Sequence, residues 1–375
     1  MPEIHPGLIT YCTNIHPAET WAETFAALAG HIPAVKAAVS PDTPFPIGLR
    51  LSNRAARELS GTGAGQLSAW LGDHGCFVPT INGFPYGSFH GNRVKEQVYL
   101  PDWRSPKRAA YTTCLADLLA NLLPEGITGS ISTVPIGFKG VVLTEDFLLV
   151  REQLHAVLLH LSRIMQERGK RIVLALEPEP ACILETTDEL CRLFGEMAFP
   201  PDLQLHLGIC LDCCHQAVQF EEPATCLSRL QEAGIPIAKV QASSAIRLVD
   251  PDDAMLRSYD EPCYLHQVVI RRRDGTLLRY PDLPNALAGH RRISGDEWRC
   301  HFHVPIFLAG TGTPGTTRRF LEELLPPLPK GILLEVETYT WDVLPPELRS
   351  GTVTDSIIRE ITWLKEQTDA AHRRP

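Results

Sequence analysis

A carboxylate and an imidazole stand three residues apart in the segment Leu207-Gly-Ile-Cys-Leu-Asp-Cys-Cys-His215. The run up to Asp212 is apolar and favours a strand, and a helical segment begins as the chain reaches His215. A D-x-x-H pair at the end of a strand can share one divalent cation, or one residue can bind the metal while the other handles a substrate proton. This spacing predicts a metal-dependent site whose other ligands come from elsewhere in the chain.

Four successive strand-like runs end in polar side chains. Their polar residues are Glu177 and Glu179, Asp212, Lys239 and Gln241, and Glu335 and Glu337. A buried strand rarely ends in an unpaired carboxylate. Such an oxygen-rich set suits Mn²⁺, Mg²⁺ or Zn²⁺. We therefore expect one or two divalent ions bound by Glu177, Asp212, Gln241 and Glu335.

The alternatives at these positions differ in strength. Glu335 and Glu337 point the same way by alternation, and Glu335 is favoured because it lies closer to the strand body. Glu179 is less favoured because prolines flank it. Asp212 could instead cap the following helix. Lys239 could clamp a substrate or act as a general base, or it could form a buried salt bridge with Glu177 or Asp212.

Histidines and a glycine-rich loop supply further candidates. In His301-Phe-His303, residues i and i+2 of a strand face the same side, so both imidazoles could reach one ion, although a solvent-facing strand is an equal alternative. Asn82, Tyr86 and His90 lie in the loop that begins Asn82-Gly-Phe-Pro-Tyr86 and are candidates for substrate binding. An ordinary packed loop would explain the same residues.

The elements that must position these residues alternate between short apolar strands and amphipathic helices. The expected strands are 8–12, 47–51, 77–81, 129–133, 172–177, 207–212, 237–242 and 332–337. Eight such β-α units predict an α/β fold of the (β/α)8 TIM-barrel type, with the polar strand ends at one mouth. An open doubly wound sheet is less favoured, because no G-x-G-x-x-G or phosphate-binding loop follows the first strand.

Two connections are much longer than usual, and such loops are commonly functional. One covers 82–105. The other, 244–315, is expected to be an insertion with a β-hairpin, because 264–272 and 276–280 flank the tight-turn pair Asp274-Gly275, and with a further strand-like run at 298–307. We expect residues 1–375 to form a single barrel carrying this insertion.

Charge and composition exclude some classes of function. The formal net charge of −9 argues against a general grip on nucleic-acid phosphates or anionic membranes. No apolar segment reaches the roughly 18 residues of a membrane span, and the first residues do not form a signal peptide. The 11 cysteines are scattered through apolar segments, which predicts reduced thiols and a cytoplasmic protein. The cluster Cys210, Cys213 and Cys214 has no second cysteine pair, so a cysteine metal site is disfavoured.

Glu on the fifth strand, D-x-x-H on the sixth, a polar residue on the seventh and Glu on the eighth together resemble the xylose-isomerase-like barrel superfamily of isomerases, ketose 3-epimerases and endonuclease IV-type phosphodiesterases. The resemblance implies a divalent metal on residues matching Glu177, Asp212, the strand-seven position and Glu335, with His215 as substrate contact or second-metal ligand. One departure is Gln241, which stands where epimerases of the superfamily usually present histidine. His301 or His303 could replace it, since the endonuclease branch carries an acid-x-His pair after this strand.

Longer motifs resemble the bacterial EboE family of metabolite traffic proteins. They are Thr10-Tyr-Cys-Thr-Asn-Ile-His-Pro17, Thr80-Ile-Asn-Gly-Phe-Pro-Tyr86, Ser130-Ile-Ser-Thr133 and Leu176-Glu-Pro-Glu-Pro180. This resemblance spans nearly the whole chain and implies a role in handling or exporting a metabolite precursor. It supplies no reaction.

These observations support a metal-dependent enzyme for a small sugar-like or secondary-metabolite precursor. As an isomerase or epimerase, it would use Glu177 and Glu335 to move a proton, with His215 and Lys239 as further catalytic candidates. As a hydrolase, a two-metal phosphoesterase for example, it would activate water on a metal. The alternative from another class is a carrier that keeps the metal site and converts nothing. A homo-oligomer or proteins from the same gene cluster are the expected partners.

Overall fold

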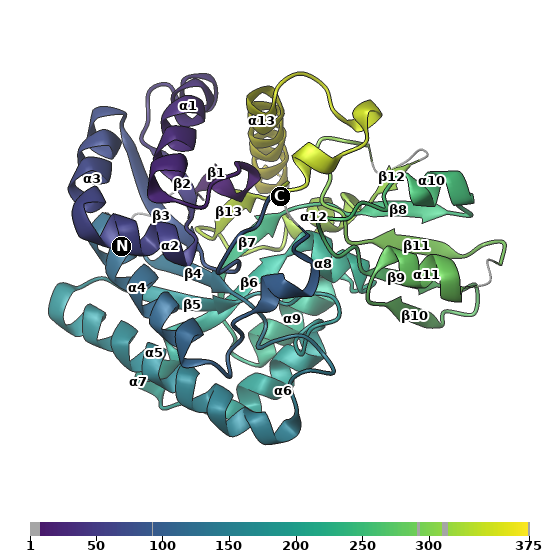
Figure 1. Cartoon of the computed structure of the whole chain (residues 1–375), viewed down its shortest axis with the longest axis horizontal. Coiled ribbons are helices and arrows are strands. Elements are labelled where there is room, and N and C mark those ends of the chain that lie inside the picture. Colours follow the sequence, from purple (N-terminus) through teal and green to yellow (C-terminus); the bar gives the residue numbers. More distant parts are fainter. Residues whose placement is uncertain (1–7, 92, 291–292, 310–313, 374–375) are drawn as a thin grey trace.

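A computed structural model describes residues 8–91, 93–290, 293–309 and 314–373. Eight parallel strands form its centre and are listed in chain order: β1 (Ile9–Tyr11), β2 (Phe45–Arg50), β3 (Cys76–Asn82), β4 (Gly129–Thr133), β5 (Ile172–Leu176), β6 (Leu207–Asp212), β7 (Ile237–Ala242) and β13 (Leu333–Val336). Their order in the sheet is β1-β13-β7-β6-β5-β4-β3-β2, and a parallel bridge from Cys12 to Gly48 joins the two edges. The sheet is therefore a nearly closed barrel, which confirms the expected TIM-barrel fold (Figure 1).

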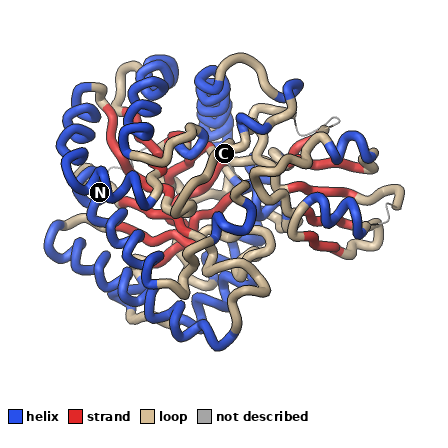
Figure 2. The backbone as a smooth tube through the Cα atoms, viewed as in Figure 1, coloured by secondary structure: helices blue, strands red, loops and turns tan. Residues whose placement is uncertain are grey.

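Helices surround these strands, as the red and blue segments of Figure 2 show. The longer ones are α1 (Trp21–Val39), α3 (Ala64–Asp73), α4 (Pro106–Leu122), α5 (Phe147–Arg168), α6 (Thr187–Met197), α9 (Pro223–Glu232) and α13 (Val353–His372). Shorter ones are α2 (Asn53–Glu58), α7 (Pro201–Gln204), α8 (Cys213–Val218) and α12 (Arg319–Leu324). The helical segment expected after His215 is divided into α8 and α9, with Pro223 opening the second.

Local signals set where several helices begin and end. Thr20, Thr186 and Thr352 each cap a helix and form a capping box with an acidic residue three positions later. Gly169 ends α5 in the left-handed conformation, with φ of 66°. These signals fix where three helices begin and where α5 ends.

The insertion after β7 forms a sheet of its own beside the barrel (Figure 1). Its strands are β8 (Ile246–Val249), β9 (Val268–Arg271), β10 (Leu277–Tyr280), β11 (Glu297–Cys300) and β12 (Gly315–Thr316), in the order β10-β9-β11-β8-β12. Two short helices, α10 (Asp253–Arg257) and α11 (Leu283–Gly289), accompany it. The expected hairpin is β9–β10. Of the expected strand-like run 298–307 only the beginning forms a strand, β11, so His301 and His303 lie beyond the strand on which they were expected. Within the expected insertion 244–315, residues 291–292 and 310–313 lie outside the described residues.

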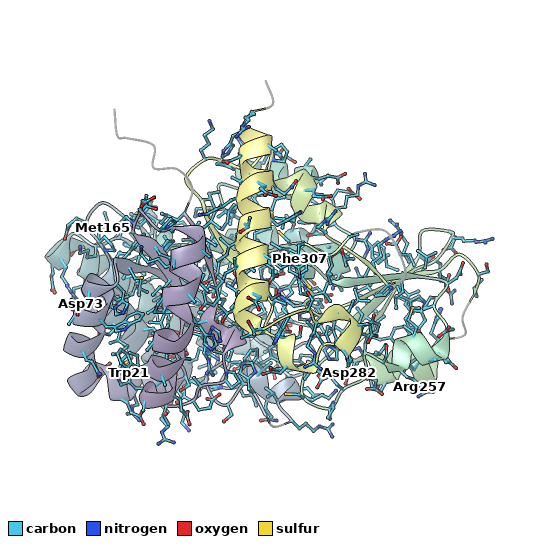
Figure 3. All side chains as sticks on the ribbon, turned by 90° about the horizontal axis from the view of Figure 1, so that it is seen from above. Trp21, Asp73, Met165, Arg257, Asp282 and Phe307 are labelled. Carbon is cyan, nitrogen blue, oxygen red and sulfur yellow. The ribbon has the colours of Figure 1, made fainter. Side chains whose placement is uncertain are left out.

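The loop after β3 and the insertion meet over the barrel mouth. The carbonyl of Cys263 accepts hydrogen bonds from the backbone N–H groups of Val94 (2.8 Å) and Lys95 (3.1 Å). Lys95 also forms a largely buried ion pair with Asp282 at 2.6 Å. Asp282 lies in the part of the molecule occupied by the insertion in the view from above (Figure 3). The two long connections thus close together over one end of the barrel.

Two further expectations can be compared with the structure. All 11 cysteines are free, as their scattered spacing predicted. Among the described residues, no helix is both long enough and apolar enough to cross a membrane.

Candidate metal centre at the barrel mouth

Three carboxylates from different strand ends converge at the mouth. Each of Glu177, Asp212 and Glu337 offers one oxygen, and these oxygens lie within 4.8 Å of one another. All three side chains are buried. Asp212 Oδ1 accepts hydrogen bonds from His215 N at 2.9 Å and Ser243 Oγ at 2.8 Å, but Asp212 Oδ2 and Glu177 Oε2 are buried and have no hydrogen-bond partner among the described residues. Unpaired buried oxygens carry a large desolvation cost, which a bound cation would remove.

Burial and mutual repulsion shift the proton affinities of this group. Burial raises the pKa of Glu177 to about 8, although nearby His215 opposes the shift. Burial and the charges of Glu177 and Asp212 raise the pKa of Glu337 well above its ordinary value. For Asp212, burial is outweighed by His215, His303 and the hydrogen bonds it accepts, so its pKa is lowered. Asp212 therefore holds the permanent negative charge, while the two glutamates can keep protons near neutral pH.

Glu335, the expected ligand, lies in a different environment. Its carboxylate accepts from Lys239 Nζ at 2.5 Å, and both side chains are fully buried. A Cβ at Gly48 would lie only 1.8 Å from Glu335 Oε1, so the carboxylate occupies space that only glycine leaves open. Glu335 and Lys239 form a pair inside the barrel and are absent from the cavity lining, while Glu337, two residues later, lines the cavity. The geometry therefore favours Glu337 over Glu335 as the carboxylate of the mouth.

Two imidazoles adjoin Asp212 with their ring nitrogens facing each other. Asp212, His215 and His303 form a second group with ligand atoms within 4.8 Å. His215 Nδ1 donates to Pro178 O at 2.7 Å and His303 Nδ1 donates to Glu337 O at 2.9 Å, because a carbonyl only accepts. In neutral rings this leaves both lone pairs on the Nε2 atoms, which are 3.4 Å apart. Two nitrogens on one tetrahedral zinc lie about 3.3 Å apart, given Zn–N bonds of about 2.0 Å.

A third imidazole belongs to the same cluster. His301 Nε2 lies 3.1 Å from His303 Nε2. Gln267 Nε2 donates to Pro180 O at 3.0 Å and to Tyr99 OH at 2.9 Å, so its Oε1 faces His301 Nδ1, which donates at 2.6 Å. The lone pair of neutral His301 therefore also lies on Nε2. Hydrogen bonds of this kind fix the ring orientation of metal-binding histidines.

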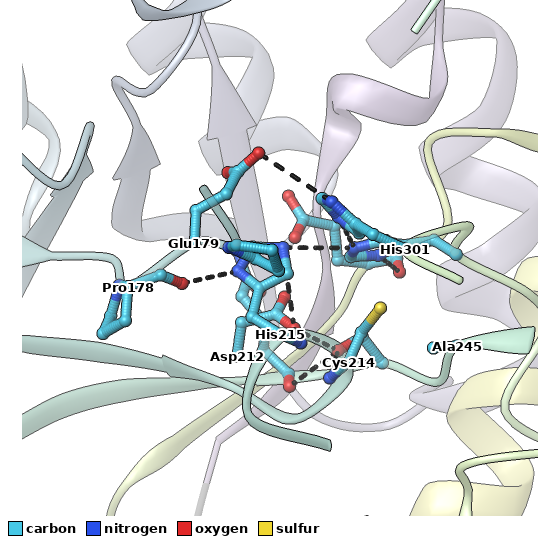
Figure 4. Close-up of polar contacts among 12 residues, drawn as sticks. Pro178, Glu179, Asp212, Cys214, His215, Ala245 and His301 are labelled. Carbon is cyan, nitrogen blue, oxygen red and sulfur yellow. Dashed lines mark hydrogen bonds and ion pairs between the residues drawn. The ribbon is translucent and has the colours of Figure 1, made fainter. Parts of the chain in front are cut away.

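The pKa values of these histidines differ with their neighbours. Burial lowers the pKa of His301 well below its ordinary value, and it lowers that of His303 to about 4, partly offset by Asp212. His215 is buried too, but the carboxylates of Asp212, Glu179 and Glu177 outweigh burial and raise its pKa. Figure 4 shows His215 between the Pro178 carbonyl and the other imidazoles, with Glu179 reaching towards His301.

Gln241 and Cys214 complete the inner surroundings. Both amide atoms of Gln241 are buried without a partner, and its backbone lies opposite Asp212 and Glu335 in the sheet. Cys214 offers a sulfur within 4.8 Å of nitrogens of His301 and His303. The sequence disfavoured a cysteine site, and the structure brings this one thiol, rather than the three cysteines together, to the histidines.

The three substrate-binding candidates of the glycine-rich loop have different positions. Asn82 lines the cavity and donates to Glu337 Oε1 at 3.2 Å. His90 lies outside the cavity lining and bridges Asn14 O at 2.5 Å and Tyr264 OH at 2.8 Å, so it ties the loop after β3 to the insertion. The ring of Tyr86 packs edge-on against Tyr111 at 5.1 Å, also outside the cavity lining.

Several residues at the site were absent from the sequence-based set. Asn14 donates to Glu337 Oε1 at 2.7 Å, and Tyr99 donates to Glu179 Oε1 at 2.6 Å. Tyr339 lines the cavity beside His303, with ring centroids 4.7 Å apart. Asn14 could have been predicted as a site residue from the sequence, because it follows the end of β1 by three residues. Tyr99 lies in a long loop whose path no periodicity predicts.

Comparison with solved structures defines the class of fold. Similar structures include the IolI protein with a bound zinc atom (TM-score 0.52, 12% identity, covering 98% of this chain and 100% of that chain). A second is a xylose isomerase-like TIM barrel protein from Mycobacterium smegmatis in complex with magnesium (TM-score 0.53, 12% identity, covering 99% of this chain and 99% of that chain). A third is a D-allulose 3-epimerase from Methylomonas sp. in complex with D-allulose (TM-score 0.53, 11% identity, covering 97% of this chain and 97% of that chain). No protein-family model and no curated protein matches the chain. The chain thus has the fold of the xylose-isomerase-like TIM barrels.

Proposed function

We propose that the protein is a divalent-metal-dependent enzyme of the isomerase or epimerase class, acting on a small molecule with adjacent hydroxyl and carbonyl groups. The observation that carries the proposal is the pair of buried, unpartnered oxygens, Glu177 Oε2 and Asp212 Oδ2, beside Glu337 at the barrel mouth. The zinc, magnesium and D-allulose in the similar structures support a metal and a sugar-like ligand.

The described residues offer places for one or two ions. Glu177, Asp212 and Glu337 supply the oxygen ligands that Mn²⁺ and Mg²⁺ prefer. His215 and His303 share Asp212 with that group and supply nitrogen ligands, which suit Zn²⁺. Relative to the ligands expected from the sequence, the proposal replaces Glu335 by Glu337. It gives Gln241 no ligand role.

A bound divalent cation would polarise a carbonyl and lower the pKa of a neighbouring hydroxyl. The residues of the chain would then move the proton between the two carbons of the substrate. Glu177 and Glu337 suit this step, because both carboxylates face the cavity from different strand ends and a carboxylate there can accept or return a proton. Asn14 and Asn82 both donate to Glu337 Oε1 and fix its orientation. Lys239 is committed to Glu335 and has a structural role.

Metal-dependent hydrolysis, including a two-metal phosphoesterase reaction, is a second candidate. Asp212 belongs both to the carboxylate group with Glu177 and Glu337 and to the group with His215 and His303. Two-metal hydrolases place shared ligands between their ions, so this arrangement favours hydrolysis. Two tightly bound ions per chain and release of an acid or phosphate product would favour this reaction over isomerisation, which conserves mass.

The EboE resemblance adds a proposed setting, the handling of a metabolite precursor in the cytoplasm together with other copies of the chain or proteins of the same gene cluster. In this setting the alternative is a carrier without catalysis. Incubation with an extract of producer cells followed by untargeted mass spectrometry separates the two, because turnover creates a new mass or isomer and carriage only enriches an existing compound.

The first test is metal content after purification, together with thermal stabilisation by added Mn²⁺, Zn²⁺ or Mg²⁺. We expect about one or two ions per chain and a higher Tm with the matching metal. Glu177→Gln combined with Asp212→Asn should abolish both effects. Glu167→Gln, on the exposed surface of α5, is the matched control and should leave them unchanged. Metal binding by the double variant at the level of the parent would contradict the proposed ligands.

A further inference from the structure

The cavity at the mouth has a polar floor and an apolar wall. The floor consists of carboxylates, amides and an imidazole: Asn14, Asn82, Glu177, Glu179, His215 and Glu337. The wall comes from the loop after β3, the insertion and the segment after β13: Phe84, Phe89, Val94, Val98, Leu265 and Tyr264, with Tyr339 beside them. Three wall rings pack together, with the centroid of Phe89 5.4 Å from Tyr264 and 5.1 Å from Tyr339.

The polar atoms of the wall tyrosines, and those of the lining residues Tyr99 and Lys95, already contact other groups of the protein. Tyr99 OH donates to Glu179, and Tyr264 OH bonds with His90 Nδ1 at 2.8 Å. The ammonium of Lys95 pairs with Asp282 at 2.6 Å. The hydroxyl of Tyr339 points to an imidazole of the histidine cluster, 3.5 Å away. A molecule against this wall therefore finds hydrocarbon and ring faces, with few side-chain groups to hydrogen-bond.

We infer that the substrate is amphipathic: a hydroxyl- and carbonyl-bearing head sits on the metal floor, and an apolar substituent packs against the wall. This inference rests on the proposed function. A simple sugar exposes hydroxyls in every direction, and burying those against the wall without partners would cost free energy. A hydrocarbon group gains free energy there through loss of water contact.

The space between floor and wall is about 50 Å³, far below the several hundred Å³ of a typical ligand pocket. An apolar substituent therefore enters only when the wall moves outward. The contacts that have to part are the hydrogen bonds from Val94 and Lys95 to Cys263 and the Lys95–Asp282 ion pair. These contacts join the loop after β3 to the insertion, so substrate entry requires the two long connections to separate.

A series of n-alkyl hydroxamates tests the inference, because the hydroxamate head binds divalent metals and the tail can be lengthened one methylene at a time. The full chain loaded with Mn²⁺ or Zn²⁺ would be titrated with acetohydroxamate and with hydroxamates of four, six and eight carbons. We expect affinity to rise about threefold to fourfold for each methylene that reaches the wall. No gain with tail length would overturn the inference.

Two variants make the test specific. Val98→Asn places a polar group in the wall at a partly exposed position, so it should fold and should flatten the dependence on tail length while leaving acetohydroxamate binding unchanged. Val141→Asn makes the same change at a half-exposed site away from the cavity and should behave like the parent. An unchanged dependence in Val98→Asn would also overturn the inference. If the protein takes up no metal, the proposed function fails and the inference falls with it, whereas metal uptake with hydroxamate binding that does not depend on tail length defeats the inference alone.

Discussion

Replacing Glu177 by glutamine should make the metal-free protein less sensitive to rising pH. Burial raises the pKa of Glu177 from 4.5 to about 8, so the folded protein holds a proton there that the unfolded chain has already lost. An acid of this kind binds more protons in the folded state. Folding stability therefore falls as pH rises between the two pKa values, and glutamine, which stays neutral, removes the fall.

The magnitude follows from the width of the pH window. Each pH unit changes the free energy of unfolding by about 1.36 kcal/mol when one proton separates the two states. His301 and His303 have lowered pKa values, so they act in the opposite sense, but only below about 6.5, their ordinary value. Between pH 6.5 and 8, Glu177 should thus cost the parent about 2 kcal/mol relative to the variant. This is an upper limit, because the glutamine also loses the attraction of the Glu177 carboxylate for His215.

Urea unfolding of chelator-treated parent and Glu177→Gln at pH 5.5, 6.5, 7.5 and 8 measures this difference. The parent should lose stability relative to the variant across the upper three values, and Glu167→Gln should follow the parent. Parallel pH dependence of parent and Glu177→Gln would refute the reasoning, since it would mean that the Glu177 carboxyl ionises as easily in the folded protein as in the unfolded chain.

Three other outcomes follow from the geometry. Glu337→Gln should weaken Mn²⁺ binding at least 100-fold by isothermal titration. Glu335→Gln should still bind the metal but lose about 3 to 5 kcal/mol of stability, because Lys239 is left buried and unpaired. Equal loss of metal binding in both variants would contradict the choice of Glu337 over Glu335. His303→Gln should weaken Co²⁺ binding and reduce the visible absorption of nitrogen-bound cobalt, and an unchanged spectrum would exclude His303 as a ligand. Gln267→Leu should weaken Co²⁺ binding by about 10- to 100-fold, because His301 loses the hydrogen bond that fixes its ring, and unchanged affinity would show that this bond does not matter.

The barrel could be predicted from the sequence because local signals agree with the tertiary structure along most of the chain. Strand β6 was expected at 207–212 and is found at Leu207–Asp212, and β7 was expected at 237–242 and is found at Ile237–Ala242. Each is a short run of mainly apolar residues before a helical segment, and parallel strands buried on both faces have this pattern. The hairpin β9–β10 was predictable for a similar reason, because Asp274-Gly275 specifies a tight turn.

The choice between Glu335 and Glu337 could not be made from alternation, which gives the two residues the same direction. It depends on depth along the barrel axis. Strand β13 ends at Val336, so Glu337 lies just beyond it at the mouth, where Asn14 and Asn82 donate to it. The histidines posed a similar problem. His301 follows β11 rather than belonging to a strand, so its approach to His303 depends on the path of the insertion.

The two glutamates of this segment show how the barrel separates stability from chemistry. Glu335 lies one layer below the mouth, where Lys239 neutralises it and Gly48 leaves it room. That pair costs desolvation free energy on both sides, but it places no unpaired charge in the barrel interior. Glu337 accepts hydrogen bonds from the amides of Asn14 and Asn82 and shares its surroundings with Glu177 and Asp212, and it forms no ion pair within the described residues. A cationic side chain thus compensates the lower layer, while the upper layer holds carboxylates whose protons a divalent ion can displace.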